Sequence, residues 1–127
     1  MDKAALVNVD IERGSEILRA LDAARLKVNV VAWFQLPEYQ DPRLVLASPT
    51  FDSVDLGKAY GLINRALRDA KFPVEHKPPL LILPMKDPLI RDLRRTFGKA
   101  KSVSGMRIGG QMIGDRFIDD GYVYRVV

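Results

Sequence analysis

Three stretches of the chain place apolar residues at the spacing of an amphipathic helix. They span residues 3–24, 53–71 and 88–97, and each has a polar face opposite its apolar stripe. The third begins with Asp87 followed by Pro88, which are preferred residues for the cap and the first position of a helix. We therefore predict three helices at these positions.

The first predicted helix contains two residues that bear on its local structure. Asp2 precedes the apolar stripe and is expected to cap the helix. Gly14 lies inside the stripe. A residue without a side chain either weakens a helix there or allows another element to pack closely against it.

Three patterns typical of β-strands follow the first helix. Residues 27–36 alternate between two faces, and the second face is only half polar, so we expect another element to cover part of it. Residues 43–47 form a second apolar strand after a short, proline-rich break, which favours an antiparallel hairpin. Residues 80–83 are a continuous apolar run between prolines, typical of a strand buried on both faces.

The region 105–127 is rich in glycine and β-like. The sequence Asp119-Asp120-Gly121 favours a tight hairpin between the strands on either side of it. The last strand runs up to Val127, and a terminal strand at the edge of a sheet can pair with a second chain. This pattern suggests a homodimer that forms through a C-terminal edge strand.

The order of these elements is α-β-β-α-β-α-β-β, with no internal repeat and no linker. Helices and strands that mix without regular βαβ alternation are typical of the α+β class. The sequence therefore predicts one compact α+β domain over residues 1–127, with a mixed sheet of about five strands and three helices.

Composition excludes several kinds of chemistry. The 127 residues include no cysteine and one histidine, His76, which rules out thiol nucleophiles, thiolate metal sites and two-histidine metal sites. We expect no cofactor and no metal. No apolar run is long enough for a membrane span, and the N-terminal residues lack the layout of a secretory signal. The sequence therefore predicts a cytoplasmic protein that does not contact a membrane.

Positive charge is concentrated in one segment. Residues 86–107 hold seven basic and two acidic residues, whereas the rest of the chain holds 13 basic and 14 acidic residues. Concentrated charge on an ordered element attracts a polyanion. We predict a non-enzymatic binding module that presents this segment to nucleic acid or to an acidic protein. Its predicted binding residues are Arg91, Arg94, Arg95, Lys99, Lys101 and Arg107.

Three alternatives remain open at this stage. The basic helix is also explained as a solvated face whose cations favour the helix C-terminus. A small Mg-dependent nuclease or phosphodiesterase would use Glu75 and Lys77, together with an upstream carboxylate from Asp52, Asp55 or Asp69. The third alternative is a structural subunit of a larger assembly, which would contact its partners through the hairpin that carries Trp33 and through its sheet edge. We expect Trp33 in the core or at its rim, and an exposed Trp33 would mark a partner surface.

Overall fold

The computed structural model describes residues 6–98 and 105–127. Its main sheet has five strands in the order β3-β2-β1-β7-β4. Strands β2 and β3 run parallel, whereas the other neighbours are antiparallel, so the sheet is mixed as predicted. The strands are β1 (Val30–Gln35), β2 (Arg43–Ala47), β3 (Leu80–Ile82), β4 (Met106–Ile108) and β7 (Asp120–Val126).

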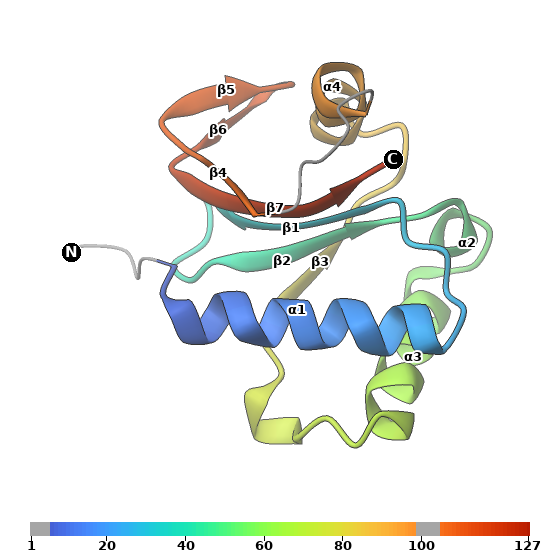
Figure 1. The fold of residues 1–127 in the computed structure, drawn as a ribbon. Helices are drawn as coiled ribbons and strands as arrows, with labels where there is room; N and C mark the ends of the chain where they lie inside the picture. Colours follow the sequence, from blue (N-terminus) through green and yellow to red (C-terminus); the bar gives the residue numbers. More distant parts are fainter. Residues whose placement is uncertain (1–5, 99–104) are drawn as a thin grey trace.

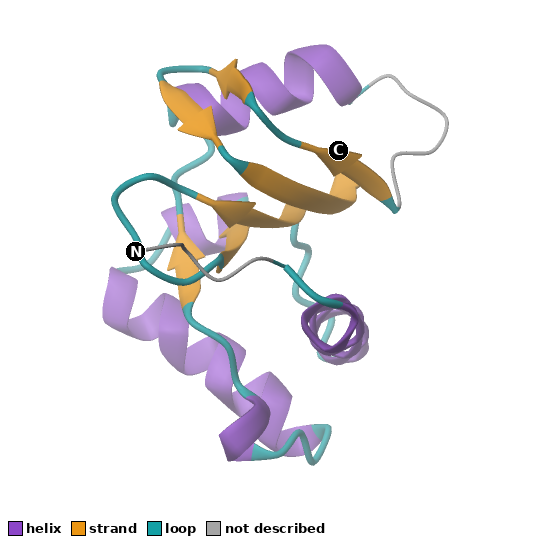
Figure 2. Cartoon of the chain, turned by 90° about the vertical axis from the view of Figure 1, so that its left-hand side faces the viewer, coloured by secondary structure: helices purple, strands orange, loops and turns teal. Residues whose placement is uncertain are grey.

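Helices cover both faces of this sheet (Figure 1). Helices α1 and α3 pack on one face, while α4 packs on the other beside a separate hairpin of two short strands, β5 and β6. Figure 2 shows the same layers from the side, with α1 seen end-on. The α+β class is therefore confirmed. The remaining elements are α1 (Asn8–Ala23), α2 (Pro49–Asp52), α3 (Leu56–Asp69), the 3-10 helix η1 (Val74–His76), α4 (Pro88–Phe97), β5 (Gln111–Ile113) and β6 (Arg116–Ile118).

The sheet separates two hydrophobic cores. The core beneath α1 and α3 includes Val31 and Trp33 of β1, and the core beneath α4 includes Val30 and Phe34 of the same strand. Strand β1 is therefore buried on both faces along its whole length. This confirms the expectation that another element covers the half-polar face of residues 27–36, and that element is α1 together with α3.

Close contact between α1 and the sheet occurs at Gly14. The indole Nε1 of Trp33 donates hydrogen bonds to the Asp10 carbonyl and to the Tyr124 hydroxyl, each at 3.0 Å. The Tyr124 hydroxyl donates in turn to the Ile11 carbonyl. A Cβ at Gly14 would lie 2.6 Å from Trp33 Nε1. Of the two explanations that the sequence allowed for this glycine, close packing is therefore the correct one. Trp33 is only 2% exposed, so it belongs to the core and does not mark a partner surface.

Two helices differ from their predicted bounds. Helix α1 begins at Asn8 rather than near residue 3, because the Asp10 carboxylate accepts a hydrogen bond from the backbone N–H of Val7 and caps the helix there. The proposed cap Asp2 lies outside the described residues. The second predicted helix, over residues 53–71, corresponds to α3, which begins at Leu56 because Asp55 caps it. A separate short helix, α2, precedes it and is capped by Ser48.

The C-terminal region has a different topology from the one predicted. Gly121 lies inside β7, not in a hairpin turn, and β7 pairs with both β1 and β4. A Cβ at Gly121 would approach Phe34 Cδ1 to 2.8 Å, so close packing on β1 explains the glycine. Because β7 is an internal strand, it does not provide the free edge on which pairing of two copies was predicted.

The edges of the main sheet are β3 and β4. Strand β3 was expected to be buried on both faces, but it lies at an edge, with Leu80 buried and Leu81 and Ile82 partly exposed. Its continuous apolar run arises because it separates the two cores: Leu80 packs in one core and Leu81 against the other.

Candidate nucleic-acid interface

Helix α4 forms as its sequence predicts. The Asp87 carboxylate accepts a hydrogen bond of 2.9 Å from the Leu89 backbone N–H, and Pro88 occupies the first turn. Leu89, Ile90 and Leu93 are fully buried against the sheet. These three positions fix the rotation of the helix, so the positions opposite them point to solvent.

Three arginines occupy outward positions of α4. Arg91, Arg94 and Arg95 are all exposed. Arg94 Nε donates a hydrogen bond of 2.9 Å to the Val127 carbonyl, and Arg95 forms an ion pair with Asp92 one turn earlier. The Arg91 guanidinium has no hydrogen-bond or ion-pair partner among residues 6–98 and 105–127. At least one of the three cations is therefore available to a ligand without exchanging a contact.

Asp92 links this face to the neighbouring hairpin. Its carboxylate accepts a hydrogen bond of 2.8 Å from the backbone N–H of Gly114, in the turn between β5 and β6. That hydrogen bond, with a further contribution from Arg95, holds the pKa of Asp92 below its usual value. Asp92 is therefore ionised at neutral pH, and it offsets part of the charge of Arg95.

The hairpin contributes an exposed apolar pair to the same layer. Ile113 and Ile118 are buried in the core beneath α4, so the alternating residues of β5 and β6 face outward. These are Met112 and Phe117, which are cross-strand partners and are 60% and 39% exposed. We call the set Arg91, Arg94, Arg95, Met112 and Phe117 the α4–hairpin surface.

Arg107, which the sequence grouped with α4, faces the other side of the sheet. Met106 and Ile108 pack in the core beneath α4, so the residue between them points toward α1. Arg107 forms two hydrogen bonds with the Asp120 carboxylate, at 3.0 and 2.7 Å, and another with the Leu6 carbonyl. It therefore has a structural role in joining β4 to β7. Lys99 and Lys101 lie outside the described residues.

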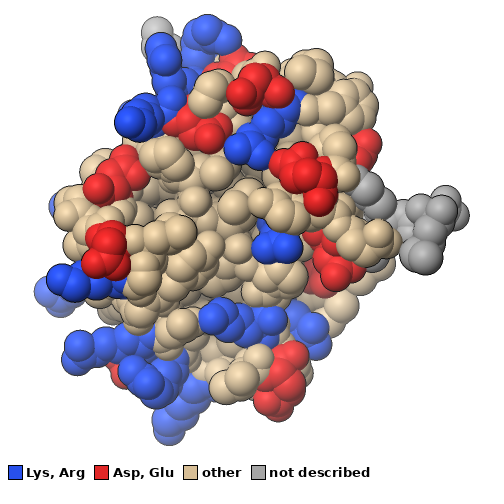
Figure 3. Space-filling model, turned by 180° about the vertical axis from the view of Figure 1, so that it is seen from behind, with Lys and Arg blue, Asp and Glu red and all other residues tan. Residues whose placement is uncertain are grey.

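A second basic area lies over α3 and the segment after it. Its charges are scattered along the sequence among Asp69 and Glu75, and the local charge count therefore missed them. Seen from behind, Lys and Arg side chains gather at the top, where α4 lies, and at the lower left, where α3 lies (Figure 3). The helical spacing of exposed residues opposite the buried stripe of α3 was the signal that could have found them. The basic residues of this area are Lys58, Arg65, Arg68, Lys71 and Lys77.

The residues named for a metal-dependent nuclease lie in the described part of the structure, where several of them have other contacts. Glu75 and His76 lie in η1 rather than on a strand, and the Lys77 ammonium donates to the Asn64 side chain. Asp52 accepts from the Met85 N–H, and Asp55 caps α3. Within the described residues, no group of three or more His, Asp or Glu side chains is placed to hold a metal ion.

No helix in the described part of the chain is both long and apolar enough to cross a membrane. Comparison of the chain with protein-family models, with curated proteins and with solved structures found no match.

Proposed function

We propose that this protein is a non-enzymatic binding module that binds nucleic acid through the α4–hairpin surface. The observation that carries the proposal is the outward face of α4, where three exposed arginines lie within two turns of one well-capped helix. Arginines at this spacing can each contact a phosphate of the same strand. A rigid helix holds them in place, so little ordering of the protein is needed on binding.

The exposed pair on the hairpin favours nucleic acid over a purely electrostatic partner. Phe117 is a partly exposed aromatic residue in the layer that also contains the arginines. Stacking of a base on an aromatic ring contributes about 1–3 kcal/mol and tolerates any base. We therefore expect binding to single-stranded nucleic acid with little sequence preference.

Existing contacts on this surface are weak enough to exchange for phosphate contacts. The ion pair between Arg95 and Asp92 has a highly exposed arginine, with 79% of its side chain accessible. Such exposed pairs contribute little because water screens them, whereas charge-assisted hydrogen bonds to phosphate are among the stronger polar contacts. Arg91 adds a contact without any exchange.

The test is equilibrium binding of labelled single-stranded DNA and RNA to three proteins. The wild type is compared with Arg91→Glu/Arg95→Glu and with Lys58→Glu/Arg65→Glu, a control on α3 that makes the same change in net charge. We expect the α4 variant to lose at least about tenfold in affinity and the control to bind nearly as the wild type does. Equal loss in both variants would contradict the proposed location.

A second comparison separates nucleic acid from an acidic protein. Polyglutamate supplies negative charge without bases, so it should bind more weakly than an oligonucleotide of similar length. Phe117→Ser should weaken binding of the oligonucleotide but not of polyglutamate. If polyglutamate binds as tightly and Phe117→Ser has no effect, an acidic protein is the better assignment for this surface.

A further inference from the structure

A cavity of about 530 Å³ lies between the C-terminal half of α3 and the segment that follows the helix. Its size is within the usual range for sites that bind small molecules, about 300–1,000 Å³. It adjoins the core beneath α1 and α3, so it lies on the opposite side of the sheet from the α4–hairpin surface. The lining residues are Asn64, Leu67, Arg68, Lys71, Phe72, Pro73, Val74 and Lys77.

The end of α3 builds the apolar part of this cavity. Lys71 adopts a left-handed conformation with φ of 60°, and the backbone N–H of Phe72 donates to the Leu67 carbonyl at 2.9 Å. This is a Schellman ending, in which the residue after the left-handed position packs back on the helix. Phe72 also makes an edge-on ring contact with His76, at 6.4 Å between centroids, which helps to fix the following turn.

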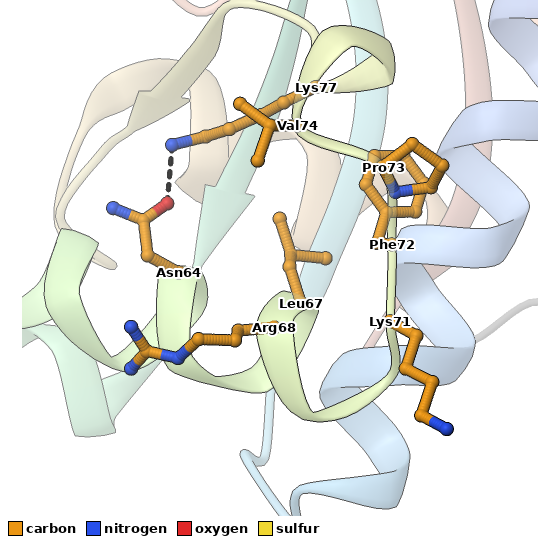
Figure 4. A pocket seen from close by; sticks show the side chains of 8 residues that line it. All are labelled: Asn64, Leu67, Arg68, Lys71, Phe72, Pro73, Val74 and Lys77. Carbon is orange, nitrogen blue, oxygen red and sulfur yellow. Dashed lines mark hydrogen bonds between the residues drawn. The ribbon is translucent and has the colours of Figure 1, made fainter.

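The polar groups of the cavity gather on one side (Figure 4). Lys77 extends toward Asn64 and donates a hydrogen bond to its side-chain oxygen, and the Arg68 guanidinium lies on the same side of the view. Leu67 and Val74 point toward each other in the middle, with Phe72 and Pro73 on the far side. The Lys71 side chain points away from the cavity.

Two features of the cavity lining favour a ligand: the sign of its charged side chains and the exposure of one apolar side chain. Its charged lining residues are all cations, and no acidic side chain of the described residues lines it. Val74 is 85% exposed, so an apolar side chain is in contact with solvent in the same cavity as Arg68 and Lys77. A ligand that covers Val74 while presenting negative charge to Arg68 and Lys77 would satisfy both features.

We propose that this cavity binds a small organic anion, in which a carboxylate or phosphate is attached to an apolar body. The anionic group contacts Arg68 and Lys77, and the Asn64 amide supplies a further donor. The apolar body covers Leu67, Phe72 and Val74. This inference is independent of the proposed nucleic-acid binding, because none of its residues belongs to the α4–hairpin surface.

The probe is 2-naphthoate, compared with the neutral 2-naphthamide in an NMR titration of the full chain labelled with nitrogen-15. We expect 2-naphthoate to bind with a Kd of about 1 mM or lower and to shift the amide signals of residues 64–77. The neutral amide has nearly the same shape but no charge, so it should bind at least about fivefold more weakly. Equal binding of the two probes would overturn the proposal.

Charge reversal in the cavity gives the second test. Arg68→Glu and Lys77→Glu should each weaken 2-naphthoate binding by about tenfold or more. Arg65→Glu makes the same change on the same helix outside the cavity and should have little effect. These positions are exposed, so the folded spectrum should be retained in all three variants. The proposal is wrong if no signal shifts at saturating probe, or if Arg65→Glu weakens binding as much as Lys77→Glu does.

Discussion

At the scale of single residues, the packing of α1 on the sheet depends on Gly14. The hydroxyl of Tyr124 and the indole N–H of Trp33 occupy the space where a side chain at this position would lie. We expect Gly14→Ala to lower the free energy of unfolding by about 2–3 kcal/mol, because either the helix or the buried pair must move. Urea denaturation followed by circular dichroism measures the change.

Gly61 provides the matched control for this prediction. It also lies within a helix, α3, but a Cβ there would meet nothing within 4 Å. Gly61→Ala should leave stability unchanged or raise it by up to about 1 kcal/mol through helix propensity. If both variants change stability by the same amount, the close-packing role of Gly14 is wrong.

The buried Tyr124 hydroxyl makes stability depend on pH in the alkaline range. Burial raises the pKa of Tyr124 above the value near 10 of an exposed tyrosine. In the pH range between the tyrosine pKa of the unfolded chain, near 10, and the higher pKa of the folded protein, Tyr124 stays protonated in the folded protein. The same tyrosine has lost its proton in the unfolded chain. Stability therefore falls as pH rises above about 10, by up to ~1.4 kcal/mol per pH unit for this one group.

Tyr124→Phe tests this dependence. The variant loses the hydrogen bond to the Ile11 carbonyl, so it should be about 1 kcal/mol less stable at neutral pH. Above pH 10 its free energy of unfolding should fall less steeply than that of the wild type. Parallel curves for the two proteins in urea denaturation between pH 8 and pH 11 would show that Tyr124 does not titrate differently on folding.

At the scale of elements, the hairpin of β5 and β6 is held on α4 through Gly114. This residue has φ of +62°, and a Cβ there would lie 2.6 Å from the backbone of Pro88. Gly110 has a similar φ of +64° but open space around it. Gly110→Ala thus carries the backbone strain alone, about 1 kcal/mol.

Gly114→Ala should therefore destabilise the protein by about 1–3 kcal/mol more than Gly110→Ala does. The added cost comes from moving the turn away from the start of α4 and from weakening the hydrogen bond between the Gly114 N–H and Asp92. Urea denaturation gives the difference, and amide signals of α4 report whether the helix is disturbed. Equal losses would mean that the hairpin does not depend on this contact.

Some of these elements could be predicted from the local sequence and others could not. Helix α4 was predicted with its observed bounds because Asp87 and Pro88 specify its start by short-range chemistry. The Asp120-Gly121 turn signal was misleading, since Gly121 is required by a contact with Phe34, which is far away in sequence. The start of α1 was missed because Asp10, inside the predicted helix, caps the true one. Long-range packing and competing caps cannot be identified from periodicity.

At the scale of the whole molecule, the fold divides the predicted basic residues between two faces. Arg91, Arg94 and Arg95 are exposed together on α4, as the sequence indicated. Arg107 is close to them in sequence, but strand alternation turns it to the opposite face of the sheet, where Asp120 neutralises it. The hairpin that carries the exposed Phe117 packs over the same core as α4, and no local sequence pattern predicts that these two elements share a layer.

The most direct test of the proposed nucleic-acid surface is the salt dependence of single-stranded DNA binding. Wild type, Arg91→Glu/Arg95→Glu and Lys58→Glu/Arg65→Glu are titrated over a range of salt concentrations. Each phosphate contact contributes about −0.7 to the slope of log K against log salt for a single strand. We predict a slope near −2 for the wild type and the α3 control, and a slope about one unit or more shallower for the α4 variant. Identical slopes in the wild type and the α4 variant, or no binding by the wild type at low salt, would contradict the proposal.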